Sequence, residues 1–150
     1  MNHDDTIVAV ATPRGKGARG IVRLSGPDAA RIVGECLEDK FPEGTYVRFE
    51  SRVRLPDTGP FGAAVYVMRA PRSYTREDVV EIHAWGAAPL LAAIVEQVLR
   101  SGARLAQPGE FTRRAFLNGR IDLAQAEAVL AVIRARSDEE ERLALSALSG

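Results

Sequence analysis

The sequence predicts an α+β fold, a mixed β-sheet with packed helices. Short runs of β-branched and apolar residues indicate strands, and longer segments with helical periodicity lie among them. Strands and helices do not alternate strictly, which argues against a purely parallel α/β arrangement. The chain has 150 residues, of which 46% are hydrophobic and 27% charged, enough for about one globular domain with a buried core.

Most strands are expected in the first 85 residues, at 6–12, 20–25, 45–55, 63–69 and 78–85. The segment 45–55 gives a clear signal, because apolar and charged residues alternate along it as in a half-buried strand. Pro, Asp and Gly residues in 56–62 predict a turn. The segments on either side of this turn should therefore form a hairpin.

Helices are expected from Pro27 to about residue 37, at 89–100, at 108–117 and from Asp122 onward, with a short strand at 103–106. Asp122 and Gln125 resemble a capping box, and Ser137 with Glu140 predicts a second helix start. Leucines continue to the end with nothing after them to bury them. Either the chain belongs to something longer, or a second copy covers that face.

Composition limits the function classes. Twenty basic residues balance twenty acidic ones, so binding of nucleic acid through a general positive field is not expected. A single cysteine, Cys36, excludes a disulfide framework or a multi-cysteine metal site. The acidic start does not resemble a signal peptide, and no apolar stretch is long enough to cross a bilayer. A soluble, cytoplasmic protein without membrane contact is expected.

The glycine-rich segment 15–20 fits the pattern G-x-G-x-x-G. That pattern binds dinucleotides when it joins a strand to a helix. Here it joins two expected strands, so a flexible cationic loop near a ligand or partner is the better interpretation, and direct RNA binding by the Arg-rich segment 14–23 is a further candidate. No P-loop motif occurs, so this chain should not hydrolyse a nucleoside triphosphate by P-loop chemistry.

Glu81 is the most informative candidate site residue, because it lies in an otherwise apolar strand and a buried carboxylate needs partners. Two interpretations stay open: a structural ion pair with an arginine, or a ligand with two parallel N–H donors, such as a pterin or guanine edge. His83 shares its face and could be satisfied by a neighbour, bind metal or move protons. Arg23 and Arg120 suit an anionic ligand or a solvated surface.

Three blocks of the chain resemble one known family. They read DTIVAVATPRGKGARGIVRLSG (5–26), PRSYTREDVVEIH (71–83) and PGEFTRRAFLNGRIDLAQAEAV (108–129). In this order and spacing they are similar to the N-terminal region of the tRNA-modification GTPases of the MnmE (TrmE) family.

The resemblance implies a fold similar to the folate-binding module of the glycine-cleavage T-protein. It further implies a tetrahydrofolate-binding and dimerisation domain at 1–120, followed at 121–150 by the start of a helical domain. Family members place an aminomethyl-type group on the wobble uridine of tRNA together with the flavoprotein MnmG (GidA). A folate such as 5-formyltetrahydrofolate would supply the one-carbon unit. GTP, Mg²⁺ and K⁺ would belong to a GTPase domain outside this chain.

The family's folate contacts fall on Arg23, Glu81 and Arg120, with Glu81 at the pterin edge and the two arginines at anionic or carbonyl groups. The family usually has Lys where this chain has Arg120, and commonly Gly at Arg76. A further departure lies at 84–88, where AWGAA replaces the family's His-Gly-Gly, with Trp85 for His and Ala87 for Gly. The alternative function is therefore a dimerisation scaffold that has lost folate binding.

Overall fold

The computed structural model describes residues 4–11 and 18–149 and confirms the α+β prediction. Its elements are β1 (Ile7–Val10), β2 (Arg19–Ser25), α1 (Ala29–Gly34), β3 (Tyr46–Leu55), β4 (Thr58–Met68), β5 (Val79–Trp85), α2 (Ala88–Arg100), β6 (Arg104–Leu105), α3 (Glu110–Leu117) and α4 (Leu123–Ser149). The strands form one sheet in the order β3-β4-β5-β2-β1-β6. The β1–β6 pair is parallel and the other neighbouring pairs are antiparallel, so the sheet is mixed.

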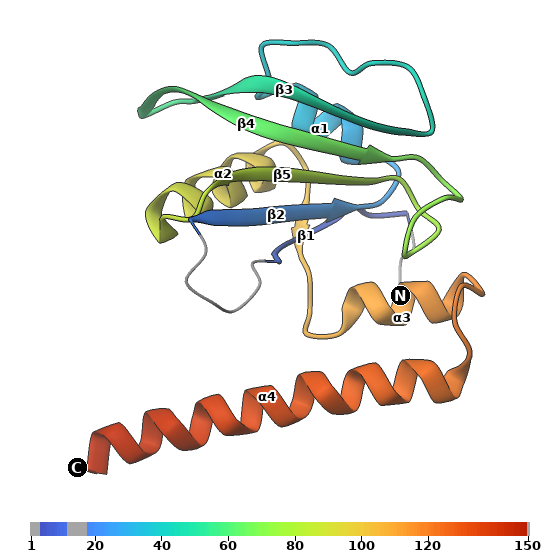
Figure 1. Ribbon diagram of the computed structural model, residues 1–150, viewed down its shortest axis with the longest axis vertical. Helices are drawn as coiled ribbons and strands as arrows, with labels where there is room; N and C mark the ends of the chain where they lie inside the picture. Colours follow the sequence, from blue (N-terminus) through green and yellow to red (C-terminus); the bar gives the residue numbers. More distant parts are fainter. Residues whose placement is uncertain (1–3, 12–17, 150) are drawn as a thin grey trace.

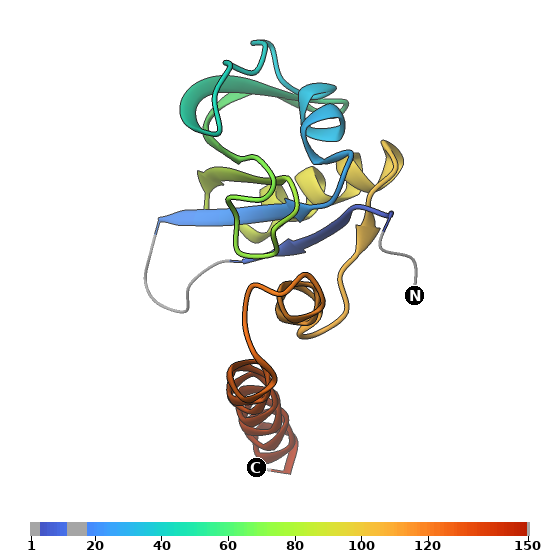
Figure 2. The same cartoon turned by 90° about the vertical axis from the view of Figure 1, so that its right-hand side faces the viewer.

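The helices lie on both sides of the sheet. Figures 1 and 2 show α1 and α2 against one face, whereas α3 lies on the other side of β1 and β2, with α4 beyond it. The main core lies under α1 and α2, where apolar strand residues pack against apolar helix residues, among them Val22, Leu24, Val65, Val80, Ile82, Ile32, Leu91, Ile94 and Val98. The opposite face, here called the open face, carries polar side chains from the same strands.

The hairpin is longer than the sequence predicts. The turn contains only Pro56 and Asp57, and β4 already begins at Thr58, so the prediction of a turn over 56–62 was wrong. Cross-strand pairing with β3 outweighs the turn preferences of the glycines and proline there. The alternation predicted for 45–55 is confirmed, because Val53 and Leu55 are buried while Arg52 and Arg54 are exposed.

The first helix is shorter than expected, covering Ala29–Gly34 rather than continuing to about residue 37. Leu37 instead forms an isolated β-bridge with Val53, and the amide of Arg54 donates to the carbonyl of Cys36 at 2.8 Å. The strand β3 thus captures the residues that follow the helix. Such a long-range contact is invisible in local sequence preferences.

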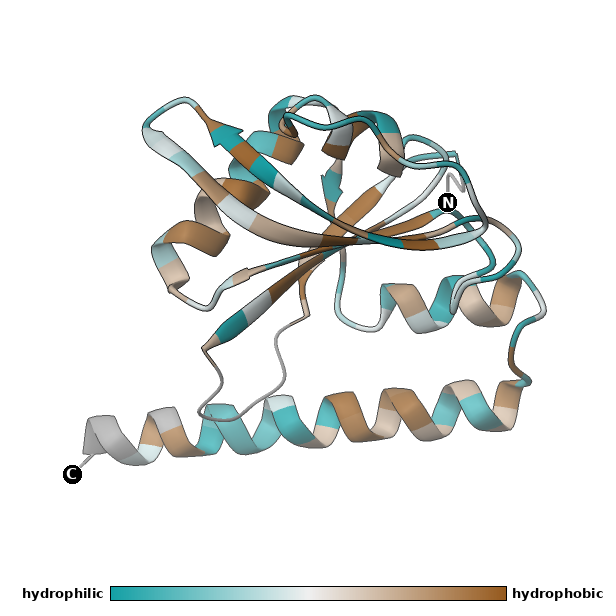
Figure 3. Ribbon diagram, turned by 45° about the horizontal axis from the view of Figure 1, so that its top comes forward, coloured by the Kyte–Doolittle hydropathy of each residue, from teal (hydrophilic) through white to brown (hydrophobic). Residues whose placement is uncertain are grey.

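The last helix starts with the predicted capping box. The Gln125 amide donates to Asp122 Oδ1 at 2.7 Å, and the Asp122 amide donates to Gln125 Oε1 at 2.9 Å. The second helix start at Ser137 was wrong, because α4 continues through it and its hydroxyl donates to the Ile133 carbonyl one turn back. Figure 3 shows apolar residues recurring along α4, of which Leu143 and Leu145 are exposed. None of the described helices is long and apolar enough to span a membrane.

The expected boundary at 120/121 falls in the turn between α3 and α4 and stays a prediction. Residues 15–17 of the glycine-rich motif lie outside the described residues. Its last glycine, Gly20, is buried in β2, and a Cβ there would run into the Leu91 side chain. Packing of α2 against the sheet is therefore sufficient reason for a glycine at this position.

Candidate functional site

A row of polar side chains crosses four neighbouring strands on the open face. Arg23 in β2 is paired with Glu81 in β5, Glu81 with Tyr66 in β4, and Tyr66 with Arg48 in β3. Residues in register on one face of a sheet have side chains close enough to interact. The sequence-predicted residues Arg23 and Glu81 are thus brought together directly.

Both carboxylate oxygens of Glu81 have a partner within the domain. Arg23 Nε donates to Oε2 at 2.6 Å, and His83 Nε2 lies 2.9 Å from Oε1. The Glu81 side chain is 14% exposed, so its surface remains partly reachable from solvent. Of the two interpretations of Glu81, the structural ion pair is present. The contact with Arg23 uses only one nitrogen of the guanidinium fork.

Glu81 is held in its ionised form. Burial alone would raise its pKa, but the hydrogen bond from His83 and the charge and hydrogen bond of Arg23 outweigh burial and keep the pKa below its ordinary value. An ionised carboxylate has about four acceptor positions, two on each oxygen. One contact on each oxygen leaves about one position per oxygen, which is the number that a ligand edge with two parallel N–H donors requires. The residues present therefore fit a pterin edge.

The ring of His83 is fixed from the neighbouring strand. Its centroid lies 4.4 Å from that of Tyr66, and Arg48 Nε donates to the Tyr66 hydroxyl at 3.1 Å. His83 is only 16% exposed. Among the described residues, no group of three or more His, Cys, Asp or Glu side chains is arranged to hold a metal ion.

Helix α3 supplies one wall beside the site. The guanidinium carbon of Arg23 lies 5.9 Å from the centroid of the Phe111 ring, so Arg23 sits between an aromatic ring and the Glu81 carboxylate. Arg120, the third predicted residue, is exposed in the turn between α3 and α4. Its amide donates to the Ala115 carbonyl at 2.8 Å, which ties this turn to the end of α3. No hydrogen bond or ion pair among the described residues joins the Arg120 side chain to Glu81 or Arg23.

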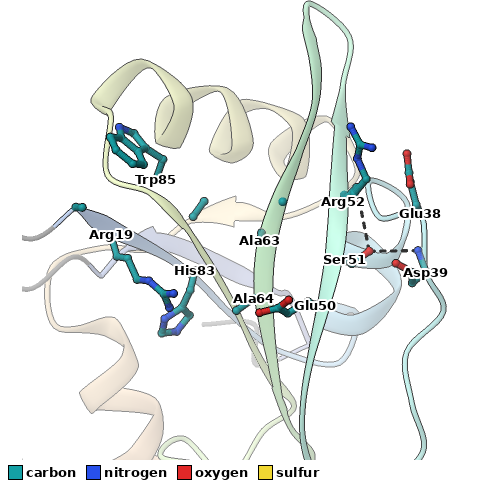
Figure 4. Close-up of a pocket in the computed structure, with 13 residues that line it drawn as sticks. Arg19, Glu38, Asp39, Glu50, Ser51, Arg52, Ala63, Ala64, His83 and Trp85 are labelled. Atoms are coloured by element: carbon teal, nitrogen blue, oxygen red, sulfur yellow. Dashed lines mark hydrogen bonds between the residues drawn. The ribbon is translucent and has the colours of Figure 1, made fainter.

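A cleft of about 660 Å³ opens next to His83. It lies where β4 and β5 separate, because their pairing ends at Ala64 and His83 while β4 continues to pair with β3. Figure 4 shows Arg19 and His83 pointing toward each other on one side, with Trp85 beside α2 on the other. The lining includes His83 but not Glu81. The cleft thus reaches the polar row only through His83, whose ring contacts Glu81 and Tyr66.

The departures from the family pattern have a clear structural setting. Gly86 is retained, and a Cβ there would lie 3.2 Å from the backbone of Arg19, so this glycine allows two segments to approach closely. Ala87 has φ −70° and ψ 125°, an ordinary conformation that needs no glycine. Trp85 is 68% exposed and points away from His83. Arg76 has φ 61°, in the left-handed region that glycine favours.

A second group of charged residues was not identified from the sequence. Arg114, on α3 and only 3% exposed, contacts Asp5 at 2.5 Å and Glu77 at 3.1 Å. Arg104 contacts Glu110, which is 2% exposed, at 2.6 Å. We call these five residues the buried cluster. It attaches α3 to the segment before β1 and to the loop before β5, and thereby places Phe111 beside Arg23.

Comparisons with known proteins identify the family of this chain. The family model of the N-terminus of the GTP-binding protein TrmE matches residues 6–120. Proteins named tRNA modification GTPase MnmE are 53% identical over 98% of this chain in Moorella thermoacetica and 51% identical over 100% in Syntrophotalea carbinolica. A third, from Streptococcus mutans, is 47% identical over 99% of this chain.

The chain spans about a third of the length of these relatives, between 33% and 34% of each. The match of the family model nevertheless covers most of the described residues, including β1 to α3 and all of the polar row. The chain therefore belongs to the family of TrmE N-terminal domains.

Proposed function

We propose that this domain binds a tetrahydrofolate, such as 5-formyltetrahydrofolate, on the open face at Glu81, Arg23 and Arg120. When bound, the folate supplies a one-carbon unit. The domain would serve a cytoplasmic tRNA modification GTPase that acts with MnmG (GidA) to place an aminomethyl-type group on the wobble uridine of tRNA. It would also hold two copies of the protein together as a homodimer.

One observation carries the proposal, the ionised Glu81 with an acceptor position left on each oxygen. Its charge is maintained by His83 and Arg23, and its side chain, although mostly buried, is 14% exposed. A carboxylate with two parallel acceptor positions matches the paired N–H donors of a pterin edge. Arg23, which is 36% exposed, is available for a carbonyl or anionic group of the same ligand.

Calorimetry with 5-formyltetrahydrofolate tests the proposal. The wild-type chain should bind, and Glu81→Gln, which keeps the shape but replaces one acceptor oxygen with a donor, should lower the affinity by about tenfold or more. Glu96→Gln is the matched control, since Glu96 is exposed on α2 and forms an ion pair with Arg100 away from the open face. No binding by the wild type, or equal binding by Glu81→Gln, would remove the folate role.

The alternative is a dimerisation domain without a ligand. The observation that favours it is the Glu81–Arg23 contact of 2.6 Å, which satisfies the carboxylate within the domain. Sedimentation equilibrium with and without the folate separates the two functions. A dimer that shows no folate binding supports the alternative, whereas a monomer at high concentration contradicts the dimerisation role in both.

A further inference from the structure

We infer that His83 is a positioning residue, which orients the Glu81 carboxylate for a ligand edge with two parallel N–H donors. This inference rests on the proposed function and goes one step beyond it. It assigns a role to a residue outside the group of Arg23, Glu81 and Arg120. Three features of the site support this role: the hydrogen bond from His83 to Glu81, the fixed position of the His83 ring and the single contact of Arg23 with Glu81.

The hydrogen bond has a defined direction. Glu81 is ionised and can only accept, so the proton of the contact between His83 Nε2 and Glu81 Oε1 resides on the nitrogen. His83 therefore donates from Nε2 in its neutral form as well as in its protonated form. The hydrogen bond to Glu81 is retained in both states of the ring.

The ring is fixed by side chains of other strands. Tyr66 packs against it with an angle of 40° between the ring planes, and Tyr66 is held in turn by Arg48. Arg19 approaches His83 from the side of β2 (Figure 4). Because Tyr66 and Arg19 hold the His83 ring in place, the ring sets the direction of the Glu81 carboxylate.

The contact with Arg23 shows what this orientation prevents. A guanidinium and a carboxylate readily form a bidentate pair in which both oxygens face the two nitrogens of the fork. Here Arg23 reaches only Oε2 through Nε, while Oε1 is held by His83. Without His83, the carboxylate is free to turn until both oxygens face Arg23. That pairing would leave the same number of acceptor positions, but it would turn them away from the direction that His83 sets for the ligand.

The test measures binding of 5-formyltetrahydrofolate to the full chain by calorimetry. His83→Ala should lower the affinity by about tenfold, whereas His83→Gln, whose amide can still donate to Glu81, should recover it to within about threefold of the wild type. Glu96→Gln, at an exposed position of α2 away from the open face, is the control and should bind as well as the wild type. Thermal unfolding verifies that each variant is folded.

A double variant separates positioning from a direct contact. If His83 acts through Glu81, His83→Ala should have almost no effect when Glu81 is already Gln. Unchanged affinity in His83→Ala, or no recovery in His83→Gln, would overturn this inference and leave the proposed function standing. No binding by the wild type would overturn the proposed function and this inference together.

Discussion

Carboxylates pair with guanidinium groups in two regions of this domain, and the two regions differ in burial and in role. At the centre of the buried cluster, Arg114 is 3% exposed and Glu110 is 2% exposed, whereas Arg104 and Asp5 at its edge are 41% and 29% exposed. On the open face, Arg23 is 36% exposed and contacts Glu81 through one nitrogen only. The same residue types thus hold a helix in place in one region and leave acceptor positions at the surface in the other.

Removing the central cation of the buried cluster should have the largest effect. Arg114→Met removes the cation that contacts Asp5, Glu77 and the fully buried Glu110, so we expect a loss of about 3–5 kcal/mol in the free energy of unfolding. Urea denaturation of the variant and the wild type measures it. Arg134→Met, at an exposed position of α4, should change stability by less than about 0.5 kcal/mol. A loss below about 1 kcal/mol for Arg114→Met would contradict the structural role of the cluster.

Acid should destabilise the domain through both regions. Hydrogen bonds from Arg104 and Arg114 lower the pKa of Asp5. His83 and Arg23 lower the pKa of Glu81, and Arg104 lowers the pKa of Glu110, although burial acts in the opposite direction on both. A carboxylate whose pKa is lower in the folded than in the unfolded state stabilises the fold at pH values above its unfolded-state pKa. This stabilisation disappears as the pH falls through the folded-state pKa. We expect the melting temperature to fall by about 5 °C or more between pH 6 and pH 3.5.

Calorimetric melting of Glu81→Gln over the same pH range sharpens the comparison. Most of the decrease should remain in this variant, because Asp5 and Glu110 belong to the buried cluster. A decrease that vanishes in Glu81→Gln would mean that the open face, and not the buried cluster, governs acid stability.

Glu81→Gln itself should have a smaller effect on stability at neutral pH. Its partner Arg23 is partly in solvent, where an unpaired charge is hydrated, so we expect a loss of less than about 1 kcal/mol. Denaturation at pH 7 measures this value next to that of Arg114→Met. Equal losses in the two variants would show that both groups are structural and would favour the alternative of a scaffold without ligand.

The smallest effect is expected at Trp85. Trp85→His restores the family residue, but the side chain is 68% exposed and points away from His83. The affinity for 5-formyltetrahydrofolate should change by less than about twofold, as measured by calorimetry. A larger change would mean that the ligand reaches across the cleft to the side of α2.

Much of the fold could be predicted from local patterns, because alternation, capping residues and turn residues act over short distances. The hairpin strand 45–55 and the capping box at Asp122 are examples. The early end of α1 could not be predicted, because it depends on the bridge between Leu37 and Val53. Likewise, nothing local distinguishes Gly20, which packs against Leu91, from a phosphate-binding glycine.

The candidate site was predictable in part for a physical reason. Arg23 and Glu81 are charged residues in apolar strands, so their need for partners is visible in the sequence, and the structure places them in contact. The buried cluster was missed because Arg113 and Arg114 are adjacent in a polar helix. Its one local signal was the spacing of four between Glu110 and Arg114, which places both on one helix face. The role of Arg120 stays a prediction.

The contacts of Arg114 make the open face of the sheet dependent on parts of the chain that are far apart. Asp5 comes from its beginning, Glu77 from its middle and Arg114 from the helix that carries Phe111. These contacts hold α3, and with it the Phe111 ring, beside Arg23 on the open face. Removing the first five residues would therefore keep every strand of the sheet but remove Asp5, one of the contacts that hold α3 and Phe111 beside Arg23.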